Sequence, residues 1–178
     1  MEIKIRPVQP AEYATTKLVV KQAFAGIEYT DGDEHELIGR LRQEHAYHPE
    51  FDVVAQRANG EIIGHALLSE ITICDQELTV TALVLAPLAV LPEYQHQGVG
   101  GRLIAYLEQA ARQAGYPAIS ILGDPAYYSR FGYQPASNYG IKASFTVPAA
   151  YYLLKPLVND GLSTVKGTIY YQAAFGLN

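Results

Sequence analysis

The stretch that decides the fold is LAPLAVLPEYQHQGVGGRLI, residues 85–104. It begins as an apolar strand, passes through a polar turn and continues as a helix that opens at a group of glycines. Because Gly98, Gly100 and Gly101 have no Cβ, a ligand can approach the main chain closely there. The first turn of a helix also presents unpaired N–H groups and the positive end of the helix dipole. The stretch therefore predicts a site where main-chain N–H groups bind phosphate.

Two common phosphate-binding patterns do not fit this turn. The chain has no Gly-Lys-Ser or Gly-Lys-Thr, which excludes a Walker loop, and the dinucleotide fingerprint needs a glycine where Leu103 stands. A kinase or a nucleotide-binding oxidoreductase is therefore disfavoured. The pattern that fits is Gln/Arg-x-x-Gly-x-Gly/Ala, here Gln95 to Gly100. Together with its strand and helix, this segment closely resembles the acetyl-CoA diphosphate loop of the GNAT superfamily of N-acetyltransferases.

A second segment strengthens the resemblance. Residues 123–133 read GDPAYYSRFGY and follow a short apolar strand expected over residues 118–122. They resemble the family's short helix with its tyrosine and aromatic ending, in the form found in small bacterial acetyltransferases. Motif similarity covers residues 80–135, and the order of the earlier elements extends it to most of the chain. The segment after Asn138 matches no motif.

The resemblance implies how acetyl-CoA, the cosubstrate, binds. Pro87 has no N–H for the sheet ladder, so we expect a bulge or splay in this strand. The pantetheine arm is then expected to pair with the main chain of Leu88, Ala89 and Val90, and one N–H of this stretch is expected to face the thioester oxygen. The diphosphate is expected to bind along a continuous run: Gln95, His96, Gln97, Gly98, Val99, Gly100 and Gly101.

The implied reaction is direct acetyl transfer to a primary amine of a small molecule or peptide. Tyr128 matches the family's tyrosine near the CoA sulfur, which makes it the expected general acid. Family members often carry an acidic residue on the long strand, but no Asp or Glu occurs between Leu78 and Leu91. Glu70, on the preceding strand, is therefore the first candidate for the general base, acting through a water. The other candidates lie near the first two helices: Glu28, Glu34 and His35.

The missing strand acid leaves two further interpretations open. An acceptor that arrives neutral needs no base. Alternatively, the chain is a non-catalytic module of the same fold that binds or senses acyl-CoA. The tyrosine-rich tail is equally open, because its aromatic residues either line an acceptor pocket or fill strand faces.

Composition excludes several other classes. The 178 residues are enough to bury a core, and we expect one domain over residues 1–178. The net charge of -5 argues against a nucleic-acid partner and favours a cationic acceptor.

No apolar run is long enough to span a membrane and the first ten residues do not resemble a signal peptide, so a cytoplasmic location is expected. His45 and His48 have no third ligand at a usable spacing, so no metal is expected. A monomer or a homodimer is expected.

The remaining periodicity predicts a strand over residues 3–7, two helices, and then three antiparallel strands. Asp33 and Glu36 resemble a capping box at the start of the second helix. Asn59-Gly60 predicts the first hairpin, and the helix is expected over residues 98–115. The fold class is therefore α/β or α+β. The resemblance specifies a GNAT fold, with a mixed, mostly antiparallel central sheet splayed at its fourth strand and helices on both faces.

Overall fold

The computed structural model describes residues 2–28 and 30–177, which divide into two compact units. The first unit comprises Met1–Leu68 and Ala86–Ala110, and the second comprises Ser69–Leu85 and Ala111–Asn178. Three elements run through both units: β3 (Ile62–Cys74), β4 (Thr79–Val90) and α3 (Val99–Gln113). The expectation of one domain over residues 1–178 stays a prediction.

The strands of the first unit form an antiparallel arrangement in the order β1-β2-β3. Strand β1 spans Ile3–Pro7 and β2 spans Asp52–Arg57, with a register irregularity after Ala55. The Asn59-Gly60 hairpin is confirmed, because the N–H of Gly60 donates to the carbonyl of Arg57 at 2.9 Å.

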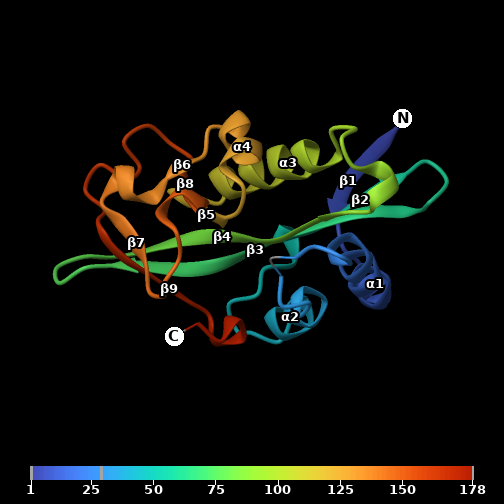
Figure 1. Ribbon diagram of the computed structural model, residues 1–178, viewed down its shortest axis with the longest axis horizontal. Helices are drawn as coiled ribbons and strands as arrows, with labels where there is room; N and C mark the ends of the chain where they lie inside the picture. Colours follow the sequence, from blue (N-terminus) through green and yellow to red (C-terminus); the bar gives the residue numbers. More distant parts are fainter. Residues whose placement is uncertain (1, 29, 178) are drawn as a thin grey trace. The chain divides into compact units, whose positions relative to one another are not determined.

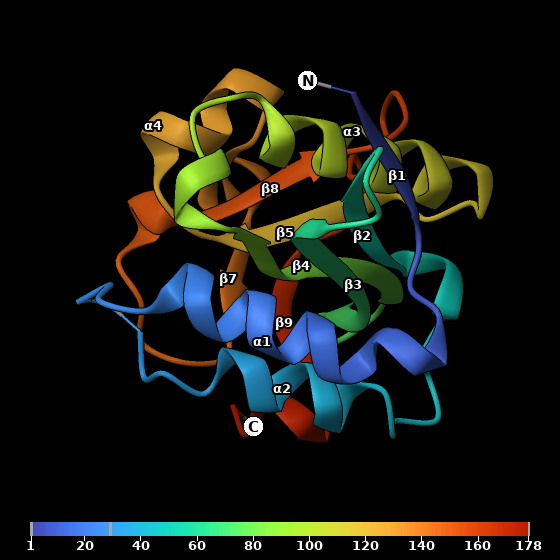
Figure 2. The ribbon, with the colours of Figure 1, turned by 90° about the vertical axis from the view of Figure 1, so that its right-hand side faces the viewer.

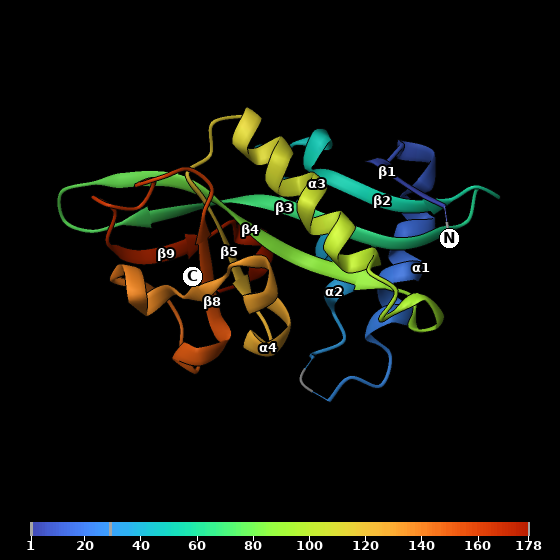
Figure 3. The same ribbon diagram turned by 90° about the horizontal axis from the view of Figure 1, so that it is seen from above.

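Helices cover both faces of the strands in the first unit. Figures 1 and 2 show α1 (Tyr13–Phe24) and α2 (Glu34–Leu41) on one side and α3 on the other. Seen from above, α3 crosses the strands (Figure 3). The helices bury apolar stripes against them: Val19, Val20, Ala23, Ile38, Leu41, Leu103, Ile104 and Leu107. This double cover excludes water from the strands that lead to the glycine-rich turn.

The capping-box interpretation is wrong. Asp33 does precede α2, but its side chain makes no cap hydrogen bond. Instead its Oδ2 accepts from Nη2 of Arg40 at 2.6 Å, and Oε2 of Glu36 accepts from Nζ of Lys17 at 2.9 Å. Both carboxylates therefore pair with cations that the local sequence pattern does not take into account.

The second unit contains the parallel part of the sheet. Strand β4 pairs in parallel with β5 (Ala118–Leu122) at Leu83–Ile119 and Val84–Ser120, and β5 pairs antiparallel with β8 (Tyr152–Pro156). The short β6 (Gln134–Pro135) follows on β8. Strand β9 (Gly167–Tyr171) pairs antiparallel with β3 and parallel with β7 (Ile141–Ala143). The expected mixed, mostly antiparallel sheet with helices is confirmed.

Short helical turns complete the chain. One four-residue α-helix, α4, spans Pro125–Tyr128. The 3-10 turns are η1 (Pro10–Glu12), η2 (Pro49–Phe51), η3 (Pro92–Tyr94), η4 (Ser129–Phe131), η5 (Ala136–Tyr139), η6 (Ala149–Tyr151) and η7 (Ala173–Phe175). Among the described residues, no helix combines the length and the apolar composition needed to cross a bilayer.

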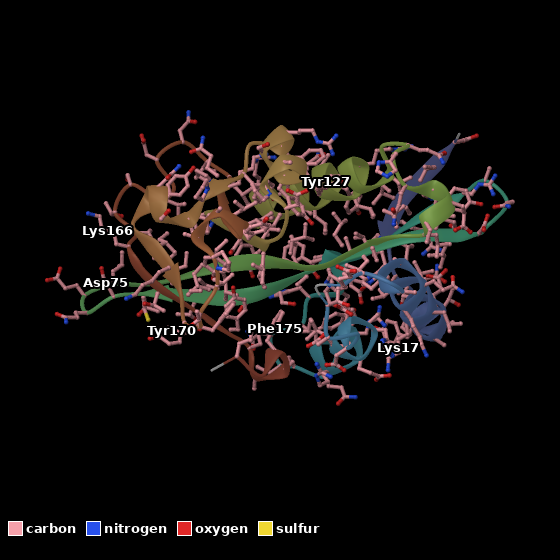
Figure 4. The ribbon with its side chains drawn as sticks, viewed as in Figure 1. Lys17, Asp75, Tyr127, Lys166, Tyr170 and Phe175 are labelled. Atoms are coloured by element: carbon pink, nitrogen blue, oxygen red, sulfur yellow. The ribbon has the colours of Figure 1, made fainter. Side chains whose placement is uncertain are left out.

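The tyrosines of the tail alternate between buried and exposed positions. Tyr152 and Tyr171 are buried and their hydroxyls lie 2.6 Å apart, whereas Tyr151 and Tyr170 are exposed. Figure 4 marks Tyr170 on β9. The ring of Phe145 contacts both buried tyrosines, with centroids 6.1 Å and 5.7 Å away. Strands at these positions were expected, and one tyrosine of each pair fills the buried face.

Candidate active site

The glycine-rich turn in the first unit is shaped by two residues in the left-handed backbone region. His96 has φ 58° and Gly98 has φ 81°, and α3 begins at the next residue, Val99. Gly98 is exposed, and a Cβ built on it would meet nothing within 4 Å. Glycine is therefore favoured here by its backbone conformation alone. Left-handed residues that alternate with ordinary ones turn neighbouring main-chain N–H groups toward one side, which suits an anion.

Two glutamine side chains brace this turn. Nε2 of Gln95 donates to the carbonyl of Val90 at 3.0 Å, and Nε2 of Gln97 donates to the carbonyl of Glu93 at 2.9 Å. Val99 is buried, with 1% of its surface exposed, so it anchors the first turn of α3 in the core. The turn is therefore fixed from within, while residues 95–98 stay exposed at the surface.

The helix that follows is also tied to the first strand. Nη2 of Arg102 donates to the carbonyl of Ile3 on β1. A cavity of about 490 Å³ lies beside the turn, and Glu2, Arg57, Asn59, Tyr94 and Gln97 contribute to its lining. The guanidinium of Arg57, which lines this cavity, already forms an ion pair, because its Nη1 lies 2.7 Å from Oε2 of Glu61.

The strand that leads into the turn alternates in burial. Pro87 and Ala89 are buried, Leu88 and Val90 are half-buried, and the Ala86–Pro87 peptide bond is cis. Ala89 lies close to β3, because a Cβ on Gly64 would be 3.1 Å from its carbonyl oxygen. The carbonyl of Val90 is occupied by Gln95. We therefore expect the hydrogen-bonding groups open to a ligand to lie mainly on Leu88, because the carbonyl of Ala89 faces β3.

In the second unit, α4 carries Tyr128. Asp124 caps this helix, because its Oδ1 accepts from the N–H of Ala126 at 2.9 Å. The ring of Tyr128 fits over Gly123 so closely that a Cβ there would lie 2.3 Å from its Cε2. The sequence pattern singled out Tyr128 but not Gly123. The sequence signal for Gly123 is a glycine placed just before a short helix that carries a tyrosine.

Aromatic neighbours hold the Tyr128 ring in place. The Tyr127 ring meets it edge-on, with centroids 4.9 Å apart. The Tyr133 ring is also edge-on to it, with centroids 6.1 Å apart. Figure 4 marks Tyr127 on α4. Burial raises the pKa of the Tyr128 hydroxyl above its ordinary value of 10.0. The hydroxyl is therefore protonated at neutral pH, which is the form a general acid needs.

Glu70 is half-buried on β3 in the second unit. Its Oε1 accepts from the hydroxyl of Tyr116 at 2.5 Å, and its main-chain carbonyl accepts from Nε2 of Gln172 at 3.2 Å. Its role as general base stays a prediction.

The other base candidates belong to the first unit. Glu28 is exposed, and Glu34 and His35 begin α2. Nε2 of His35 lies 3.5 Å from Oε1 of Glu36. Across residues 2–28 and 30–177, no group of three or more His, Cys, Asp or Glu side chains is placed to hold a metal ion.

A buried charged cluster in the first unit was not recognised from the sequence. It consists of Arg42, Asp52 and His65. The signal was present, because Asp52 and His65 each adjoin a run of apolar residues in their strand.

Comparison with known proteins identifies relatives over much of the chain. The model of the acetyltransferase (GNAT) family matches residues 19–133. The uncharacterized N-acetyltransferase YjhQ of Escherichia coli K12 is 35% identical over 116 residues, which cover 65% of this chain and 64% of that protein. The chain thus spans slightly less than two thirds of YjhQ. The uncharacterized N-acetyltransferase YhbS of the same strain is 30% identical over 69% of this chain and 72% of its own length.

Two solved structures extend the similarity to nearly the whole chain. The crystal structure of YhbS from Escherichia coli in complex with CoA has a TM-score of 0.88 and 26% identity, covering 99% of this chain and 93% of that one. A GNAT family acetyltransferase from Brucella melitensis in complex with acetyl-CoA has a TM-score of 0.77 and 28% identity, covering 98% of both chains.

Proposed function

The chain belongs to the GNAT family of acetyltransferases, and from this premise we propose that it transfers the acetyl group of acetyl-CoA directly to a primary amine of a small molecule or peptide. The observation that carries the proposal is the exposed turn at residues 95–98, with two left-handed residues ahead of the helix α3. The CoA and acetyl-CoA complexes of the two similar structures support the choice of cosubstrate.

We propose that the diphosphate of acetyl-CoA binds the main-chain N–H groups from Gln95 to Gly101. The first N–H groups of α3 have no partner within the helix, and the helix dipole favours a negative charge there. No lysine or arginine stands among these residues. Affinity for the diphosphate is therefore expected to come from the backbone rather than from paired charges.

The thioester is proposed to lie along Leu88–Val90. An N–H of this stretch, that of Leu88 in the first instance, would donate to the oxygen that becomes negative when the amine nitrogen attacks the carbonyl carbon. A donor aimed at that oxyanion accelerates acyl transfer by roughly 100- to 1000-fold. The C–S bond then breaks and leaves CoA as a thiolate.

Tyr128 is proposed to give its proton to this thiolate. Its raised pKa keeps the proton on the hydroxyl at neutral pH, and Gly123 gives the ring room to take its position. The proton lost by the amine goes to a base or to water. Glu70, acting through a water, stays the first proposal for that base, followed by Glu28, Glu34 and His35.

One observation favours a second function, a non-catalytic module that binds or senses acyl-CoA. The carboxylate of Glu70 is engaged by Tyr116, and β4 contains no acidic residue. In this case coenzyme binding would be intact, but no amine would be acetylated.

Thiol release from acetyl-CoA with a panel of polyamines, amino acids, aminoglycosides and peptides separates the two functions. An amine-dependent rate supports the transferase, and we expect cationic acceptors to be preferred because the net charge is -5. Tight CoA binding without turnover on any amine class would instead support the binding module. A Glu70→Gln variant with unchanged kcat at every pH would remove Glu70 from the mechanism.

The setting of the reaction is also part of the proposal. We propose a cytoplasmic enzyme that acts as a monomer or homodimer and has no nucleic-acid or membrane partner. Sedimentation of the purified chain measures the oligomeric state.

A further inference from the structure

The first unit contains a buried ionic cluster that the proposed reaction does not use. Asp52 and His65 are both completely buried, each 0% exposed. In the antiparallel register Leu67 lies opposite Asp52 and Val54 lies opposite His65, so the two polar residues are diagonal neighbours on one face. Arg42, just after α2, joins them with 5% of its side chain exposed.

The carboxylate of Asp52 is fully occupied. Its Oδ2 accepts from Nε of Arg42 at 2.7 Å and from the hydroxyl of Tyr47 at 2.8 Å. Its Oδ1 accepts from Nη2 of Arg42 at 3.2 Å and is 2.7 Å from Nε2 of His65. Burial alone would raise the pKa of Asp52, but the bonds from His65 and Arg42 outweigh it and lower the pKa to about 2. Asp52 is therefore an anion at neutral pH and can only accept.

This anion determines the form of the His65 ring. Because Asp52 only accepts, Nε2 of His65 carries a proton, and Nδ1 of the neutral ring is left as an acceptor. Nδ1 is buried and has no hydrogen-bond partner within the described ranges. Burial is the largest cause that lowers the pKa of His65; the bond and charge of Asp52 oppose it, and the charge of Arg42 adds to it. A second proton would bury an extra positive charge and an N–H without an acceptor.

On one side the cluster holds the helical layer. Nη2 of Arg42 donates to Oγ1 of Thr16 on α1 at 3.0 Å. The guanidinium lies 4.0 Å from the centroid of the Tyr13 ring, also on α1. Arg42 itself follows α2 directly, so one side chain ties both helices to Asp52.

On the other side the cluster adjoins the strand that carries Leu88–Val90. Gly64 is the neighbour of His65 in β3, and a Cβ there would lie 3.1 Å from the carbonyl oxygen of Ala89. The carbonyl of Ile63 accepts from the N–H of Leu91 at 2.9 Å. Closely packed strands transmit displacements, so a shift of β3 at His65 would move the adjoining part of β4.

We propose that His65 is a positioning residue for the coenzyme: its neutral ring, held by Asp52 and Arg42, keeps Leu88–Val90 in the form that binds acetyl-CoA, and protonation of the ring releases that form. The proposal rests on the proposed function, because it assumes that this stretch contacts the coenzyme. Among the described residues, the charged groups beside His65 are Asp52 from β2 and Arg42 from the segment after α2. The titratable hydroxyls next to them belong to Tyr47, from the same segment, and to Tyr13 on α1.

The test measures the affinity for dephospho-CoA between pH 5.5 and 8 by calorimetry. Dephospho-CoA is the probe because the 3′-phosphate of CoA itself titrates near pH 6, at about the second pKa of a phosphate ester. The pKa of His65 in the folded chain is lowered, so the ring takes up its second proton at a pH below the ordinary histidine pKa of 6.5. As the pH falls through that range, we expect the Kd of the unaltered chain for dephospho-CoA to rise by up to about tenfold per pH unit, which is the limit for one proton. His65→Gln is expected to abolish this rise.

Val54→Ala is the matched control, because Val54 is buried opposite His65 on the same face. It should lower stability while keeping the pH dependence of Kd. A rise of Kd that is the same in the unaltered chain and in His65→Gln would overturn the proposal, as would no rise in either. If dephospho-CoA bound at no pH, the proposed function itself would fail and the role of His65 with it.

A second measurement needs no variant. Protonation and coenzyme binding are reciprocally linked, so dephospho-CoA should lower the pKa of the His65 ring as seen by NMR. A tenfold effect on Kd corresponds to about one pH unit in that titration. The same titration curve with and without saturating dephospho-CoA would contradict the proposal.

Discussion

Gly98 in the first unit and Gly123 in the second are both positions where the structure favours glycine, but for opposite reasons. Gly98 has φ 81° and open space around its missing Cβ. Gly123 has no such backbone demand, but a Cβ there would lie 2.3 Å from the ring of Tyr128. In the proposed function the main chain of the loop is the functional group, whereas in segment 123–133 the backbone only makes room for a side chain. Substitutions should therefore fail differently at the two positions.

The largest effect is expected where the proposed proton donor, the Tyr128 hydroxyl, is removed. Tyr128→Phe should lower kcat by about 100- to 10,000-fold, the usual contribution of a general acid, because the leaving thiolate loses its proton donor. The Kd for CoA, measured by calorimetry, should stay unchanged. An unaltered kcat at saturating acetyl-CoA would remove the acid role.

Gly123→Ala should lower kcat by roughly 100-fold, because a displacement of about 1 Å is enough to misplace a reacting group. The added methyl group must push the Tyr128 ring aside. The control is the double variant: in a Tyr128→Phe background, Gly123→Ala should cost little more kcat, since both changes act on one hydroxyl. Additive losses would show that Gly123 acts through something else.

Gly98→Val should weaken CoA binding by about 5- to 30-fold, because a left-handed backbone costs a β-branched residue roughly 1–2 kcal/mol. Gly98→Asn should weaken it less, since asparagine tolerates this conformation. Calorimetry with CoA measures both. Equal losses for Val and Asn would mean that the side chain, and not the backbone, is what the site rejects.

The smallest effect is expected at Gln95. Gln95→Ala removes one hydrogen bond, to the carbonyl of Val90, which contributes roughly 0.5–1.5 kcal/mol. We expect the Kd for CoA to rise only a few-fold, with kcat retained. Gln97→Ala, which removes the similar bond to Glu93, is the matched variant. If Gln95→Ala weakened CoA binding more than Gly98→Val does, the proposal that the main chain of this turn binds the diphosphate would be contradicted.

The two regions also differ in how far the sequence could predict them. The loop is local: its strand, glycines and helix are consecutive, so the helix expected over residues 98–115 and observed as Val99–Gln113 could be found from spacing alone. The capping box at Asp33 failed because Arg40, one helix length away, competes for the same carboxylate. Local patterns do not include such partners.

Contacts between distant residues were not predictable in the same way. The Asp52–His65 pair is made by the register of a hairpin, which places residues 13 positions apart on one face. Gly123 and Tyr128 are close in sequence, but the contact depends on where the α4 turn aims the ring. Single residues of these pairs are visible in the sequence, whereas their pairing is a property of the folded chain.

The bond from Arg102 to the carbonyl of Ile3 has a practical consequence for experiments. It fastens β1 to α3, the helix that follows the turn proposed to bind the coenzyme, and Glu2 lines the cavity beside that turn together with Gln97. A bulky affinity tag fused ahead of Ile3 would therefore lie near the turn for which we propose CoA binding. Tags are better placed at the other terminus, or cleaved before calorimetry.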